Sequence, residues 1–155
     1  VATTPGELAA VIGHEIGHVE AQHANARLST QFATKSGLQL LGMMGGQTAQ
    51  SQQLMSLMGL GAQVGIILPF SRAEESEADT LGLGYMAEAG FDPREAIRLW
   101  QKMMKQGGPK PPAFLSTHPT DEARIRSLEA KMPAALDLYQ QARARGRSPA
   151  CGALQ

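Results

Sequence analysis

The chain of 155 residues has a single cysteine, few aromatic residues and no excess charge of either sign. Because Cys151 has no second cysteine to pair with, an intrachain disulfide is excluded, and cysteine usage does not indicate the redox compartment. The 14 lysines and arginines balance the 14 aspartates and glutamates. No global field would therefore gather nucleic acid, and a nucleic-acid partner is not expected.

Ser36 to Ser71 contains no Asp, Glu, Lys, Arg or His and is rich in Gly, Met, Leu and Gln. A membrane-spanning helix needs about 20 mostly apolar residues, whereas the most apolar part, Leu54 to Pro69, is shorter and is interrupted by polar residues and glycines. We expect two helices joined near Gly45-Gly46 that form a buried hairpin. The alternative is a surface at residues 36–71 that contacts a membrane or an envelope protein.

Helix-capping patterns and helical periodicity predict a mainly α chain, organised as one domain over residues 1–145 and a flexible basic tail over 146–155. Helices are expected to begin at Thr4, Ser71, Asp92 and Asp121. Pro133 should break or kink the last of them. Val1 to Glu7 has no basic region followed by an apolar run, so no signal peptide is visible. The abrupt start on a helix cap indicates a processed chain or a fragment.

The first helix contains the stretch Gly13 to His23, "GHEIGHVEAQH", which holds three of the four histidines. Its large apolar residues form one stripe, expected to face the core, with His14 and His18 along its edge. The residues of the apolar stripe are Leu8, Val11, Ile12, Ile16 and Val19. Residues four apart on a helix have Cβ atoms about 5–6 Å apart, so both imidazoles can bind one zinc ion. His23 is rotated to nearly the opposite side, and we expect it on the surface or behind the ligands.

Glu15 is rotated by about 100° from His14, which places it poorly for binding the ion but well for activating a water beside it. Zinc lowers the pKa of such a water toward about 7, and a neighbouring carboxylate can take its proton as the water attacks a carbonyl. The pattern therefore predicts cleavage of a peptide bond, with Glu15 as the general base.

Two histidines do not complete a catalytic zinc site, which usually has three protein ligands. The acidic stretch Arg72 to Asp79, "RAEESEAD", is the source of a third. Glu75 and Asp79 lie four apart, on one helical face, so one can bind the ion while the other accepts a hydrogen bond from a ligand imidazole. Spacing slightly favours Glu75 and does not exclude Glu77.

Three ordered motifs, "ELAAVIGHEIGHVEAQH", "PFSRAEESEADTLGLGYMAEAGFDP" and "FLSTHPTDEARI", resemble metallopeptidase family forty-eight. These are the gluzincins that include the CAAX prenyl endopeptidase and HtpX, and the likeness is to their soluble bacterial periplasmic branch. The resemblance implies a zincin-like core with one Zn²⁺ bound by His14, His18 and Glu75, and with Asp79 supporting them. It also implies upstream strands, one of which aligns the substrate; these strands are absent from this sequence.

The resemblance places His118 beside the active site, where three roles remain open. It stabilises the developing oxyanion, or it occupies the open zinc position in a resting state, or it anchors its loop against Arg124. Arg124 in turn binds substrate or holds that loop.

The sequence thus predicts a zinc endopeptidase that acts on protein or peptide substrates, in the quality control of misfolded or envelope proteins. A location in the bacterial periplasm or at the envelope follows from the resemblance alone. The alternatives are a latent, inactive metalloprotease-like module for assembly or chaperone work, acting by protein binding, and a zinc hydrolase of non-protein amides.

Overall fold

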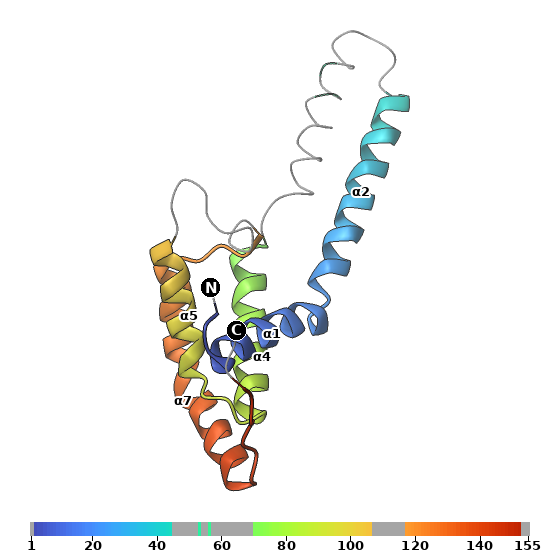
Figure 1. Cartoon of the computed structure of the whole chain (residues 1–155). Helices are drawn as coiled ribbons and strands as arrows, with labels where there is room; N and C mark the ends of the chain where they lie inside the picture. Colours follow the sequence, from blue (N-terminus) through green and yellow to red (C-terminus); the bar gives the residue numbers. More distant parts are fainter. Residues whose placement is uncertain (1, 45–52, 54–55, 57–69, 107–116, 153–155) are drawn as a thin grey trace. The chain divides into compact units, whose positions relative to one another are not determined.

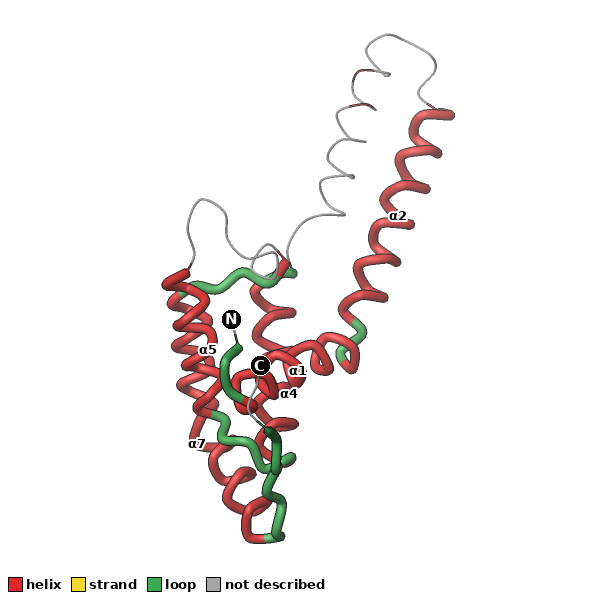
Figure 2. The backbone as a smooth tube through the Cα atoms, viewed as in Figure 1, coloured by secondary structure: helices red, strands yellow, loops and turns green. Residues whose placement is uncertain are grey.

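The computed structural model describes residues 2–44, 53, 56, 70–106 and 117–152, and its elements are helices (Figure 1). They are α1 (Pro5–Glu20), α2 (His23–Met44), α4 (Arg72–Glu88), α5 (Arg94–Gln106) and α7 (Glu122–Ala144). Figure 2 shows helix and loop, and no strand, over these described ranges. The predicted mainly α class is confirmed. The expected turn near Gly45-Gly46 and the segment from Gly107 to Ser116 lie outside the described residues.

The chain divides into two compact units, residues 1–21 with 70–155 and residues 22–69. The first unit contains α1, α4, α5 and α7. The second unit contains α2. None of the described helices is long and apolar enough to cross a membrane.

Side-chain caps start three of the helices at the predicted places. The Thr4 hydroxyl accepts a hydrogen bond from the Glu7 amide at 3.1 Å. Ser71 and Glu74 form a complete capping box, in which each side chain accepts from the other residue's amide. Asp121 accepts from the Arg124 amide at 2.9 Å. These caps fix where α1, α4 and α7 begin, and therefore where their functional side chains point.

Pro133 does not end a helix, so the predicted break is wrong. Helix α7 continues from Glu122 to Ala144 with Pro133 inside it. Proline removes one hydrogen bond of the helix ladder. Met132 and Ala135, on either side of it, are both buried in the core, and this packing holds the helix together.

The face of α1 that is buried differs from the predicted one. Leu8, Ile12, Ile16 and Val19 are 38–76% exposed, while the buried side of the helix carries two glycines, Ala10, Glu7 and the two histidines. Hydrophobic periodicity favoured the stripe of large residues. It is wrong for this helix because the neighbouring backbone lies too close to admit large side chains.

That close approach is a backbone contact between α1 and α4, which cross in Figure 1. A β-carbon placed on Gly13 would lie 2.8 Å from the carbonyl oxygen of Gly82, and one on Gly17 would lie 2.6 Å from that of Ala78. In the other direction, a β-carbon on Gly82 would lie 2.8 Å from the amide nitrogen of His14. Only residues this small allow the two helices to meet here.

The large core residues come instead from α5 and α7, packed on the far part of α4. Trp100 and Leu99 of α5 and Leu128 of α7 are at most 1% exposed. They join one cluster with Leu83 and Met86 of α4. The histidine-bearing helix is therefore held against α4 by small residues, while bulk packing supports α4 from behind.

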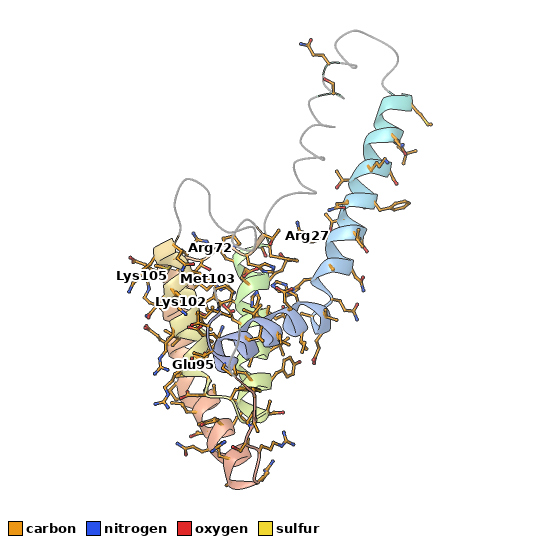
Figure 3. The ribbon with its side chains drawn as sticks, in the orientation of Figure 1. Arg27, Arg72, Glu95, Lys102, Met103 and Lys105 are labelled. Atoms are coloured by element: carbon orange, nitrogen blue, oxygen red, sulfur yellow. The ribbon has the colours of Figure 1, made fainter. Side chains whose placement is uncertain are left out.

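A buried ion pair ties the start of α1 to α5. Lys102, labelled in Figure 3, donates hydrogen bonds from Nζ to Glu7 at 2.8 Å and to the Thr3 hydroxyl at 2.9 Å. Burial alone would raise the pKa of Glu7, but the hydrogen bonds from Lys102 and Thr3 outweigh it and lower that pKa to about 2. Glu7 is therefore ionised in the folded chain at neutral pH.

Gly82→Ala should destabilise the protein by about 1–3 kcal/mol, because its new methyl group meets the α1 backbone and no flexible side chain can move aside. Gly84→Ala, two residues further along α4, is the matched control. Nothing lies within 4 Å of a β-carbon there, so alanine should stabilise the helix by about 0.5–1 kcal/mol. Thermal unfolding measures both, and equal effects of the two changes would contradict the backbone contact.

Candidate metal centre

Three histidines and one glutamate bring their ligand atoms together in the first unit. The four residues are His14, His18, Glu75 and His118, all buried, and one ligand atom from each lies within 4.8 Å of the other three. His14 and His18 come from successive turns of α1, Glu75 from the first turn of α4, and His118 from the segment before α7. The site therefore joins three separate parts of the sequence.

The distances between these atoms fit a tetrahedral ion. His14 Nε2 lies 3.1 Å from His18 Nε2 and 3.2 Å from His118 Nδ1. Carboxylate oxygens of Glu75 lie 3.0–3.4 Å from the three imidazoles. Metal–nitrogen bonds of about 2.0–2.1 Å in a tetrahedron separate neighbouring ligand atoms by about 3.3 Å. The cluster thus has the dimensions of a metal site.

One polar atom of the cluster, a carboxylate oxygen of Glu75, has no hydrogen-bond partner among the described residues. Glu75 Oε2 is buried and has no hydrogen bond of good geometry, although Arg124 Nη1 lies 2.5 Å away as an ion pair. We take this contact as charge attraction without hydrogen-bond alignment. A buried carboxylate oxygen in this position, facing imidazole nitrogens, fits a bound cation.

The charge of Glu75 is favoured by its surroundings. Burial raises the pKa of this carboxyl, but hydrogen bonds from His118, His14 and His18 and the charge of Arg124 lower it far more, to well below the ordinary range. Glu75 is therefore ionised, as a metal ligand must be.

Asp79 orients His14 from behind. Asp79 Oδ1 lies 3.0 Å from His14 Nδ1, which leaves Nε2 facing the cluster. Burial lowers the pKa of His14, but its hydrogen bonds to Asp79 and Glu75 raise it above the ordinary value overall. A carboxylate on the outer nitrogen of a ligand histidine fixes the ring and increases its basicity. This is the role that the sequence predicted for Asp79.

Arg124 holds Asp79 and the loop that carries His118. Its Nε and Nη2 donate to the two oxygens of Asp79 at 2.7 and 2.8 Å, and its Nη1 donates to the Pro119 carbonyl at 3.0 Å. Its guanidinium carbon lies 3.8 Å from the centre of the Trp100 ring, a favourable cation–π contact. Of its two predicted roles, the contacts favour holding the loop.

Glu15 lies beside the cluster without joining it. Its side chain is 48% exposed, and its Oε1 lies 3.4 Å from His118 Nε2. His118 thus faces the cluster with Nδ1 and Glu15 with Nε2. The carboxylate is near enough to act on a group at the cluster while remaining open to water.

Two residues that the sequence analysis considered lie outside the cluster, and two that it did not consider contact its histidines. His23 begins a new helix after Gln22, which has a φ of 56°, and it is buried rather than on the surface, but it is not part of the cluster. Glu77 is exposed and also outside it. Sequence reasoning missed Phe70, whose ring lies 4.1 Å from that of His18, and Trp100, which packs on His14 at 5.3 Å. Phe70 stands at the start of the second quoted motif and Trp100 lies outside all three, but no spacing rule places either ring beside a histidine.

Glu75→Ala should abolish stoichiometric metal binding, because it removes the one carboxylate among the four clustered ligand atoms. Glu77→Ala, on the exposed side of the same helix, should keep it. Elemental analysis after loading with Zn²⁺ and removal of excess metal measures both variants, with circular dichroism to verify the fold. Retention by Glu75→Ala together with loss in Glu77→Ala would move the ligand to Glu77.

Comparison with known proteins agrees with these features. The family model described as Peptidase family M48 matches residues 1–132. The chain is 37% identical over 130 residues to "Mitochondrial metalloendopeptidase OMA1" of Schizosaccharomyces pombe, covering 83% of this chain and 37% of that protein. It is 37% identical over 127 residues to "Beta-barrel assembly-enhancing protease" of Yersinia pestis, covering 77% of this chain and 26% of that protein.

The chain thus spans between about a quarter and two fifths of the length of these relatives. No solved structure matches it. The matched residues 1–132 include the four cluster residues together with Asp79 and Arg124. On this evidence the chain belongs to peptidase family M48.

Proposed function

We propose that this chain is the catalytic part of a zinc-dependent endopeptidase. One observation carries the proposal: His14, His18 and Glu75 bring two imidazoles and one carboxylate to a single buried point, with Glu15 beside it. Two histidines and a glutamate are a ligand set that catalytic zinc sites use, and they leave a position for reaction.

Zinc is favoured by the donor set. Imidazole nitrogens suit zinc and disfavour magnesium and calcium, which take oxygen ligands. A zinc ion held here supplies Lewis acidity, which lowers the pKa of water toward neutrality and polarises a carbonyl group. The charge of the ion would also help to compensate the ionised Glu75 and Asp79, which both pair with Arg124.

Glu15 is the general base in this proposal. It is partly exposed and not a ligand, so it can accept a proton from the attacking water and later donate it to the leaving amine. Asp79 keeps His14 in the tautomer that binds with Nε2, and Arg124 keeps Asp79 in place. Each residue thus has one role that its contacts support.

His118 is proposed as a fourth ligand of a resting state. Its Nδ1 lies 3.2 Å from His14 Nε2 and 3.0 Å from Glu75 Oε1, which are distances between ligands rather than between a ligand and a substrate oxygen. Its Nε2 contacts Glu15, so the ring separates the base from the cluster. Hydrolysis would then require the ring to move.

The substrates we propose are proteins, including misfolded proteins of the bacterial envelope. The names of the two relatives, a mitochondrial metalloendopeptidase and a beta-barrel assembly-enhancing protease, support a protein substrate. Contact with an envelope protein or a membrane surface through residues 36–71 is proposed on their lack of charge.

A second candidate, a latent module that acts by binding proteins, is favoured by one observation. The described residues include no strand that could align an extended peptide by strand addition. Chelator-sensitive hydrolysis of casein distinguishes the two, because only the endopeptidase would show it.

Glu15→Gln should reduce casein hydrolysis by at least about 100-fold, the usual contribution of a positioned general base, while zinc content stays at one per chain. The amide keeps the shape of the side chain but cannot accept the proton. Glu20→Gln, at the end of the same helix, is the control. If the Glu15 variant hydrolysed casein normally with its zinc verified, Glu15 would not be the base.

His118→Ala should raise casein hydrolysis, because it frees the position that the ring occupies and releases Glu15. Were His118 instead an oxyanion donor, the same change would lower turnover by about 10²–10³-fold. The control is His23→Ala, a second buried histidine outside the cluster. Steady-state rates at equal zinc content separate the two roles.

A further inference from the structure

A cavity of about 290 Å³ lies between the first turns of α4 and α7. Its size is close to the lower end for small-ligand pockets. Residues of both helix starts and of the two segments leading into them line it; those that the inference uses are Phe70, Arg72, Glu75, Asp121, Ala123 and Arg124. None of the roles assigned above requires this space.

The cavity begins at the metal centre. Glu75 belongs both to the cluster and to the cavity wall. Phe70 connects the two as well, because its ring lines the cavity and also lies 4.1 Å from the ring of His18 and 5.2 Å from that of His118. The cavity and the cluster are therefore adjacent, and Phe70 and Glu75 lie at the boundary between them.

We propose that this cavity receives a large, uncharged substrate side chain next to the bond that is cut. The inference rests on the proposed endopeptidase function and adds a specificity site to it. The substrate side chains that fit are those of leucine, methionine and phenylalanine.

The cavity wall favours apolar groups. Phe70, Pro119 and Ala123 supply an aromatic ring, a pyrrolidine ring and a methyl group. Burying a leucine or phenylalanine side chain against such surfaces removes apolar area from water and so stabilises a complex.

The charges around the cavity are already paired, which disfavours a charged side chain. Arg124 contacts Glu75 and Asp79, and Arg72 pairs with Asp121 at 2.8 Å. An incoming carboxylate would meet Glu75 and Asp121, and an incoming ammonium would meet Arg72 and Arg124. A charged substrate side chain of either sign would therefore have to break an existing ion pair or stay buried without a partner of opposite charge.

The mouth of the cavity can open at low cost. The Arg72–Asp121 pair joins the start of α4 to the cap of α7, and the two side chains are 85% and 41% exposed; Arg72 is labelled in Figure 3. Exposed ion pairs contribute little to stability, because solvent screens them. A substrate chain could therefore displace this pair without disturbing the buried part of the site.

The test uses probes that bind the metal and carry one side chain each, the hydroxamates of glycine, leucine, phenylalanine and aspartate. Their affinities for the zinc-loaded protein are measured by calorimetry, so that no hydrolysis is needed. We expect the leucine and phenylalanine compounds to bind at least about tenfold more tightly than the glycine compound, and the aspartate compound to show no such gain. Ratios between probes cancel any common cost of moving His118.

Ala123→Phe should fill the cavity from its rim and remove the preference for large side chains. Ala123 is exposed, so the fold should tolerate the change. The matched control is Ala130→Phe, two turns further along α7, exposed and not part of the cavity wall; it should keep the preference.

The inference is overturned if the wild type does not distinguish leucine from glycine, if aspartate is preferred, or if Ala123→Phe keeps the wild-type preference. Casein hydrolysis is measured on the same samples. Hydroxamate preference without hydrolysis would uphold the pocket and refute the endopeptidase proposal, and hydrolysis without preference would do the reverse. Zinc analysis of each sample shows whether the probes have their anchor; a chain that loads no zinc overturns both proposals.

Discussion

The contact between the backbones of α1 and α4 is the constraint on which the site depends. Gly13 and Gly17 on one helix meet Ala78 and Gly82 on the other at distances that exclude a further β-carbon. His14 and His18 alternate with those glycines on α1, and Glu75 and Asp79 occupy the adjoining turns of α4. Two imidazoles and a carboxylate reach one point because the helix axes come this close. A larger residue at any of the four positions would move the ligands apart.

The same closeness concentrates ionisable groups where water is excluded. Glu75 and Asp79 are each 3% exposed, and Arg124 is 7% exposed. Burying such a charged group away from water costs several kcal/mol of desolvation free energy per group, unless the group is paired with good geometry. Arg124 supplies one cation to both carboxylates, and a divalent metal ion would supply the remaining positive charge. Binding of such an ion would therefore be coupled to the folding of this region.

Local sequence rules located the parts of the site that lie on one helix. The four-residue spacing of His14 and His18 and the capping box at Ser71 depend only on helix geometry, and both are present. Spacing alone left Glu75 and Glu77 open, because the choice depends on which face of α4 meets α1. The buried face of α1 was predicted wrongly for the same reason. Hydrophobicity ranks Ile12 and Ile16 above glycine, whereas backbone contact reverses that order. Phe70 and Trp100 are brought to the histidines by tertiary packing alone.

The backbone around His118 limits how its ring can leave the cluster. On one side, the Thr117 carbonyl accepts a hydrogen bond from the Phe70 amide at 3.0 Å. On the other, the Pro119 carbonyl accepts one from Arg124, which is itself fixed by Asp79 and stacked on Trp100. Opening the loop would break both bonds and leave the buried Arg124 with an unused donor. Rotation about the side-chain bonds of His118 breaks neither of them. If His118 is the resting-state ligand that we propose, its ring can therefore leave the cluster by side-chain rotation without breaking either of these backbone contacts.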